Sequence, residues 1–94
     1  MVFDWDEGNV SHIVDDHGVW PEQVVEALYS RPVTVSKGIE GGEFRIRVVS
    51  RTSEGLVLTV VYTYRGDKIR VVTAFESGPA EIRKYEGRWG KYVE

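Results

Sequence analysis

In two neighbouring stretches of the chain between Glu43 and Arg65, every second side chain is apolar and most of those between are polar. Successive side chains of a β-strand point to opposite faces, so this period predicts half-buried antiparallel strands. The apolar positions of this pattern are Phe44, Ile46, Val48, Leu58, Val60, Tyr62 and Tyr64.

The turn after the second stretch sets the predicted register. Gly66 and Asp67 form a two-residue loop with glycine first, which is typical of a type II′ turn and pairs Arg65 with Lys68. This register predicts the core-face pairs Tyr64/Ile69, Tyr62/Val71, Val60/Thr73 and Leu58/Phe75, and the outer-face pairs Thr63/Arg70 and Val61/Val72.

For the preceding hairpin we predict a five-residue loop, residues 51–55, because a four-residue loop would turn arginines into the apolar face. The inner pairs are then Ser50/Leu56, Val48/Leu58, Ile46/Val60 and Phe44/Tyr62. The outer face of the three strands gathers cations around Thr59 and Thr63, with no acid on that face inside the strands. These cations are Arg45, Arg47, Arg65, Lys68 and Arg70.

The N-terminal third of the chain has a helical period instead. It predicts two helices, from Glu7 to His17 and from Pro21 to Arg31, and Gly18 is the residue expected to end the first. The predicted buried stripes are Val10, Ile13, Val14 and His17 in the first helix, and Val24, Val25 and Leu28 in the second.

The remaining segments complete an α+β prediction. Residues 2–5 are a candidate edge strand, residues 33–37 are the predicted outermost strand, and a glycine-rich connection follows at residues 38–42. Ser77 is expected to cap a third helix whose buried side holds Ile82, Tyr85, Trp89 and Val93. The predicted fold has two N-terminal helices, a four-stranded antiparallel sheet and a C-terminal helix, with the helices on one face of the sheet.

Length and composition restrict the class of protein. The 94 residues suffice for one domain, 1–94, and the absence of cysteine excludes disulfides and thiolate chemistry. No basic leader and no apolar run of about 20 residues is present, so we expect a cytoplasmic protein without a membrane segment. Residues 1–30 hold seven acids and no Lys or Arg, whereas the basic residues all lie in residues 31–94.

The predicted basic sheet face has two interpretations that residues alone leave open. Arginines present forked donors that match phosphate oxygens, so the face is a candidate polyanion-binding surface. A half-buried sheet also needs a polar side, so the same residues could form an ordinary solvated face.

Other titratable residues are weaker candidates for chemistry. His17 is a candidate acid or base, or else a helix-end residue stabilised by the dipole. His12 and Asp16, one turn apart, could hold a metal but lack a third ligand at suitable spacing. Glu81 and Tyr85 could present a carboxylate and a phenol beside the sheet, although Tyr85 also belongs to the apolar stripe.

Across nearly its whole length the chain resembles the BrnT-type toxins of bacterial type II toxin–antitoxin systems, which have a RelE-like ribonuclease fold. The segments that carry the resemblance are Phe3-Asp4-Trp5-Asp6 with Asn9, His17-Gly18-Val19, Ser50-Arg51-Thr52 with Gly55, the run from Leu58 to Arg70, Val72-Thr73-Ala74, and Glu81 with Tyr85-Glu86.

The resemblance implies an endoribonuclease that needs neither metal nor cofactor, cuts mRNA and inhibits translation. It also implies a BrnA-like antitoxin partner that covers the site and carries the DNA-binding part, so that operator DNA is bound only through the antitoxin. The catalytic residues implied are Arg70, Arg51, His17, Glu81 and Tyr85, and the RNA-binding ones are Arg45, Arg47, Arg65 and Lys68.

One segment departs from the family pattern. After Ala74 the family usually places one or two basic residues, whereas this chain has Phe75-Glu76. A lost cation and an added carboxylate motivate an alternative, a catalytically weak or silent module that binds RNA or protein. A metal-dependent hydrolase using His12 and Asp16 is a third hypothesis.

Overall fold

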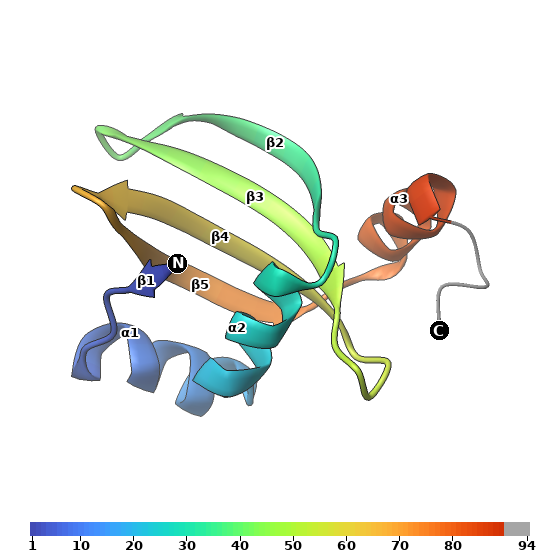
Figure 1. Ribbon diagram of the computed structural model, residues 1–94, viewed down its shortest axis with the longest axis horizontal. Coiled ribbons are helices and arrows are strands. Elements are labelled where there is room, and N and C mark those ends of the chain that lie inside the picture. Colours follow the sequence, from blue (N-terminus) through green and yellow to red (C-terminus); the bar gives the residue numbers. More distant parts are fainter. Residues whose placement is uncertain (90–94) are drawn as a thin grey trace.

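The fold is built on one twisted sheet with helices on both of its faces (Figure 1). The structure is a computed structural model that describes the backbone of residues 1–89 and the side chains of residues 1–88. Its five strands lie in the order β1-β5-β4-β3-β2. They are β1 (Val2–Phe3), β2 (Val33–Glu40), β3 (Glu43–Arg51), β4 (Val57–Arg65) and β5 (Lys68–Glu76).

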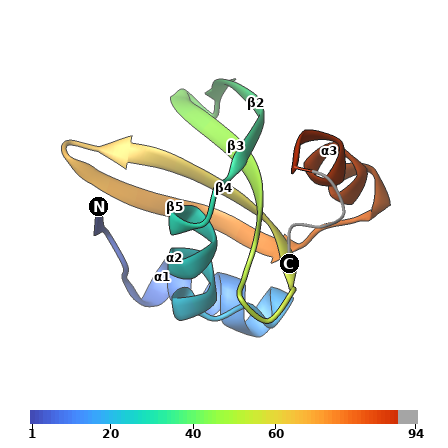
Figure 2. The ribbon, with the colours of Figure 1, turned by 45° about the vertical axis from the view of Figure 1, so that its right-hand side comes forward.

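Helices α1 (Glu7–Ser11), η1 (His12–Asp16) and α2 (Pro21–Tyr29) cover the inner face of the sheet, whereas α3 (Pro79–Trp89) lies against β2 and β3 on the outer face (Figure 2). The main core lies between the first helices and the sheet. Its fully buried members include Ile13, Val24, Leu58, Val60 and Val71. Apolar residues thus face the side that the alternation predicts.

Three parts of the predicted fold class are wrong. The sheet has five strands and is mixed, because β1 pairs in parallel with β5. The helices do not share one face, since α3 covers the outer face, where Val49 and Thr59 are fully buried. The first predicted helix changes within its length from α (α1) to π (η1) at His12.

The turns follow the glycines. Gly66 has φ +63° and Asp67 does not have a positive φ, as a type II′ turn requires. Gly18 has φ +68° after η1, so its predicted role at the helix end is confirmed. Gly41 and Gly42, both with positive φ, close the β2–β3 hairpin, and β2 continues through Gly38 to Glu40 beyond its predicted end.

The β3–β4 hairpin has the predicted faces but not the predicted partners. Its five-residue loop spans residues 52–56, one residue later than expected, so Arg51 pairs with Val57 and Ser50 with Leu58. The shift between partners is two residues, which leaves every side chain on its predicted face. Arg45 and Arg47 therefore do lie on the outer face.

A β-bulge changes the second half of β5. The predicted pairs Tyr64/Ile69, Tyr62/Val71 and Thr63/Arg70 are present, but the register then shifts, so Val61 pairs with Thr73 and Val60 with Ala74. The predicted pairs Val60/Thr73, Leu58/Phe75 and Val61/Val72 are wrong. The extra residue moves Thr73 and Phe75 from the core face to the outer face.

The third helix begins as predicted but is not capped as predicted. The Ser77 hydroxyl hydrogen-bonds the Thr59 hydroxyl (2.8 Å), and the first helical hydrogen bond runs from the Ile82 N–H to the Gly78 carbonyl. Tyr85 is buried, as expected for this stripe. The predicted places of Trp89 and Val93 lie outside the described side chains.

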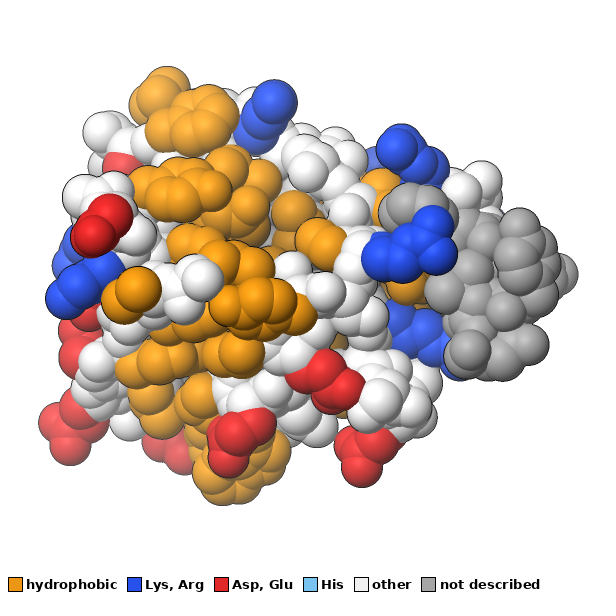
Figure 3. Space-filling view, in the orientation of Figure 1, with side chains coloured by type: hydrophobic (Ala, Val, Ile, Leu, Met, Phe, Trp, Pro, Cys, Tyr) orange, Lys and Arg blue, Asp and Glu red, His pale blue; other side chains and the backbone are white. Residues whose placement is uncertain are grey.

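The helices leave part of the inner sheet face uncovered. Phe44 (46% exposed), Tyr64 (56%) and Ile39 (70%) lie at the end where β2 turns into β3 and β4 into β5. Figure 3 shows the result as a band of apolar side chains over this face. Within residues 1–89 no helix is both long and apolar enough to cross a membrane.

Candidate active site on the outer face of the sheet

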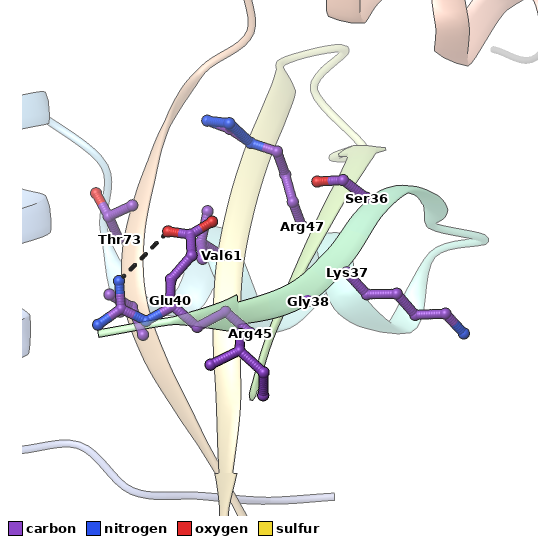
Figure 4. A pocket seen from close by; sticks show the side chains of 10 residues that line it. Ser36, Lys37, Gly38, Glu40, Arg45, Arg47, Val61 and Thr73 are labelled. Carbon is purple, nitrogen blue, oxygen red and sulfur yellow. Dashed lines mark ion pairs between the residues drawn. The ribbon is translucent and has the colours of Figure 1, made fainter. Parts of the chain in front are cut away.

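Two adjacent hollows of about 280 Å³ each form a groove on the outer face. Arg45 and Val72 line both hollows, which makes the groove continuous. Figure 4 shows the first hollow, with Arg45, Arg47 and Thr73 beneath the arch of β2. The second hollow is lined by His12, Glu43, Thr63, Arg65 and Arg70 among others.

The groove contains acids as well as cations, so the prediction of an acid-free face is wrong. Glu43, the first residue of β3, pairs with Arg45 (Nε–Oε2 3.0 Å), and Glu40 of β2 approaches the same guanidinium at 3.7 Å. Glu43 precedes Arg45 by two residues and therefore shares its face. The predicted alternation begins at Phe44 and therefore does not include Glu43.

Arg47 has a buried guanidinium nitrogen that no neighbour satisfies. Its Nε is the one buried side-chain polar atom without a hydrogen-bond partner among the described residues, since Glu81 Oε1 is 3.9 Å away. The guanidinium carbon lies over the ring of Phe75, 5.7 Å from its centroid. A buried donor without an acceptor is costly, which makes Arg47 a candidate for a functional role.

Two histidines meet beside β5. His12 and His17 have ring centroids 5.0 Å apart in an edge-to-face contact, and His17 also lies 5.7 Å from the Phe75 ring. Residues five apart share a side of a π-helix, because its hydrogen bonds join positions i and i+5. His17 is exposed, so its predicted place on the buried stripe is wrong.

Arg70 is held by the N-terminal segment. Its Nη1 lies 2.9 Å from Asp6 Oδ2 and 3.7 Å from Asp4 Oδ2, and only 17% of its side chain is exposed. The hydrogen bond from Arg70 lowers the pKa of the Asp6 carboxyl, and the same bond raises the pKa of the Arg70 guanidinium. Arg65 approaches Asp4 at 4.0 Å.

Arg51 and Tyr85 form a separate site. With Glu26 and the 52–55 segment they line a hollow of about 340 Å³, and Tyr85 is 3% exposed. Arg51 and Arg70 pair on β4 with Val57 and Thr63, which are six residues apart and hence about 20 Å along the strand. Arg51 and Arg70, both predicted as catalytic, therefore do not lie in one site.

A comparison with protein-family models identifies the family of the chain. Residues 5–81 match the family described as the ribonuclease toxin BrnT of type II toxin–antitoxin systems. The chain belongs to the BrnT family. As a BrnT toxin it has a protein antitoxin partner and an RNA substrate. No curated protein matches the chain significantly.

The two residues that depart from the BrnT pattern, Phe75 and Glu76, lie on opposite faces of β5. Phe75 lies on the outer face and contacts Arg47, which lines the first hollow, and His17. Glu76 pairs with Leu58, on the face of the buried Ala74, so its carboxylate is not on the groove side of β5. The added carboxylate thus does not oppose an anion in the groove.

Sequence reasoning missed Thr73, Phe75 and the position of His12 in this BrnT toxin. The bulge in β5 puts Thr73 in the groove and Phe75 beside Arg47, and His12 lines the second hollow from the start of η1. Neither the bulge nor the π-turn alters the apolar period. Of the remaining predicted residues, Lys68 is exposed at the β4–β5 hairpin. In residues 1–89 no three His, Cys, Asp or Glu side chains gather as metal ligands.

Proposed function

We propose that this BrnT toxin is a metal-independent endoribonuclease that cuts mRNA in the outer-face groove and so stops translation in the cytoplasm. The observation that carries the proposal is Arg47, whose Nε–H is buried beside the first hollow without an acceptor. A phosphate oxygen is the acceptor that a guanidinium fork fits.

Arg45 and Arg47 bind the scissile phosphate in this proposal. A guanidinium has five N–H donors, so the carboxylates of Glu43 and Glu40 leave donors of Arg45 for a phosphate. Lys37 borders the same hollow, but it pairs with Ile46 of the inner face, so its side chain points away from the groove (Figure 4). Arg65 and Arg70 lie farther along the groove, where they meet a flanking nucleotide if their acidic partners give way.

Phe75 offers a stacking platform for a base. Its ring already contacts a guanidinium on one side and an imidazole on another, both common neighbours of nucleobases. Base–aromatic stacking contributes about 1–3 kcal/mol and tolerates different bases. The residue that departs from the family pattern therefore supports RNA binding.

Cleavage without metal uses the 2′-hydroxyl of RNA as nucleophile. A base removes its proton, cations stabilise the phosphorane, and an acid protonates the leaving 5′-oxygen. His17 and Glu81 lie close enough to Arg47 or Phe75 to serve in proton transfer. Arg51 and Tyr85 contact RNA only if the substrate extends to their separate hollow.

The antitoxin closes the groove from the tip of the β2–β3 hairpin. Ile39 lines the first hollow, and it lies with Phe44 at the exposed apolar end of the sheet. Such a patch marks a protein interaction site. It lies on the inner face, across the edge strand β2 from the groove, so the antitoxin covers both by wrapping around β2. Phe44→Ser should weaken recovery of the toxin with its cognate antitoxin; undiminished recovery would refute this placement.

The test is cleavage of a defined mRNA by the purified toxin in excess EDTA. We expect discrete cuts with 5′-hydroxyl ends, and none where a 2′-deoxynucleotide replaces the nucleotide 5′ of the cut. A catalytically silent binding module would retain the RNA without new ends. A metal-dependent hydrolase would lose its activity in EDTA.

A further inference from the structure

A carboxylate, an imidazole and a hydroxyl form a hydrogen-bonded chain at the centre of the groove. His12 Nδ1 lies 2.9 Å from Asp16 Oδ2, and His12 Nε2 lies 3.0 Å from Thr73 Oγ1. His12 lines the second hollow and Thr73 lines the first, so the Nε2–Oγ1 contact spans their junction. These two contacts connect η1 to β5 and so hold the His12 ring at the groove.

The chemistry of the three groups sets the direction of the hydrogens. An ionised carboxylate only accepts, so Nδ1 of a neutral imidazole donates to Asp16 and Nε2 keeps its lone pair. That lone pair then accepts the Thr73 hydroxyl hydrogen. Asp16 thus fixes the tautomer in which Nε2 is ready to take a proton from a hydroxyl on the groove floor.

We propose that His12 is the general base of the cleavage reaction, with Asp16 as its positioning residue. This inference rests on the proposed ribonuclease function. The 2′-hydroxyl of the bound nucleotide takes the place of the Thr73 hydroxyl and gives its proton to Nε2. The 2′-oxygen bonds to phosphorus, the bond to the 5′-oxygen breaks, and that oxygen leaves with a proton from an acid.

Two simpler roles fit the contacts less well. A surface ion pair between residues four apart would need only Asp16 and His12, and would not direct the other nitrogen at a hydroxyl of the sheet. A metal site would need a third ligand, and among the described residues no three His, Cys, Asp or Glu side chains gather as metal ligands.

Charged groups face the ring from every element packed against it. Asp16 faces Nδ1, His17 contacts the ring edge, and Glu43, Arg45, Arg65 and Arg70 face His12 across the second hollow. In Asp16→Asn the amide can present either a donor or an acceptor to Nδ1, so it no longer fixes the tautomer that leaves Nε2 as the acceptor. We therefore expect slower cleavage by Asp16→Asn with unchanged RNA binding.

The experiment measures single-turnover cleavage by the parent toxin, His12→Ala, Asp16→Asn and, as a matched exposed acid, Asp15→Asn. We expect His12→Ala to lose about 10²- to 10⁴-fold in rate while still binding an uncleavable 2′-deoxy-substituted RNA. Asp16→Asn should also lose rate with the same retained affinity, and Asp15→Asn should behave as the parent.

Two outcomes overturn the proposal separately from the ribonuclease function. Cleavage by the parent and by His12→Ala at equal rates excludes His12 as the base and leaves the ribonuclease intact. If His12→Ala fails to fold, cleavage by Asp16→Asn at the parent rate excludes the proposal instead. A parent that cuts no RNA refutes the proposed function, and the assignment of His12 falls with it.

Discussion

The arginines of the groove differ in how fully their neighbours satisfy them. Arg70 has two carboxylates within 3.7 Å, Arg45 has two within the same distance, and Arg47 has one at 3.9 Å with its Nε unbonded. A free donor in a partly buried place is more useful to a phosphate than one already saturated. We therefore assign the phosphate to Arg47 and not to Arg70, which the sequence predicts as catalytic.

The Asp6–Arg70 contact should make stability sensitive to acid. The pKa of Asp6 is lowered from 3.8 by the Arg70 hydrogen bond and by the Asn9 N–H. A carboxyl with a lower pKa in the folded state adds stability above its unfolded pKa, and this is lost as pH falls through the folded pKa. Asp6→Asn should therefore lose less unfolding free energy than the parent below about pH 4.

Urea unfolding at several pH values measures this effect. In Asp6→Asn the new amide oxygen can still accept the Asn9 N–H bond at the start of α1, so the comparison isolates the charge. Asp15→Asn, which removes an exposed carboxylate from η1, is the control and should keep the acid sensitivity of the parent. Equal acid sensitivity in Asp6→Asn and the parent would show that the contact adds no stability.

At the scale of elements, two local irregularities build the site. The π-turn η1 brings His12 beside His17, and the bulge in β5 turns Thr73 and Phe75 outward. Each inserts one residue into a regular element, and such insertions are common at functional sites. Without the bulge, Thr73 and Phe75 would point to the core face, away from His12 and Arg47.

Gly18 ends the helical segment that carries both histidines, and replacing it should destabilise the protein. Its φ is +68°, and a Cβ would meet nothing within 4 Å, so the cost of Gly18→Ala is conformational only. We expect a loss of about 1–2 kcal/mol in the free energy of unfolding. Gly87→Ala in α3, also in open space, is the control and should gain up to about 1 kcal/mol. A gain for Gly18→Ala would contradict the account.

The sequence predicts what depends on periodicity and on turn glycines. Alternation gives β3, β4 and the first half of β5, and Gly66 gives the turn between β4 and β5. Neither pattern changes when one residue bulges out, because Thr73 and Phe75 are compatible with either face. The acidic partners of Arg70, Asp4 and Asp6, could not be predicted either, because their positions depend on β1 lying in parallel beside β5.

For the whole molecule, the acidic N-terminal segment is not confined to the face opposite the cations. Strand β1 brings Asp4 and Asp6 to Arg65 and Arg70, so part of the basic face is neutralised. The net charge of −3 also gives no long-range attraction for RNA. Binding must then depend on few contacts within the groove rather than on an extended basic surface.

This charge balance predicts a shallow salt dependence of RNA binding. The cations whose side chains face the first hollow are Arg45 and Arg47, and about two phosphate contacts give a slope of about −1.4 in log affinity against log salt. Titration of an uncleavable single strand at several salt concentrations measures the slope. A slope steeper than about −4 would require phosphate contacts well beyond the groove.

The most direct measurement is the single-turnover rate of mRNA cleavage by Arg47→Ala, compared with Arg83→Ala. Arg83 is exposed on α3 and serves as a matched loss of one cation outside the groove. We predict a loss of about 10²- to 10³-fold for Arg47→Ala, as for removal of a transition-state donor, and parent activity for Arg83→Ala. Equal rates for the two variants would contradict the assignment of cleavage to this groove.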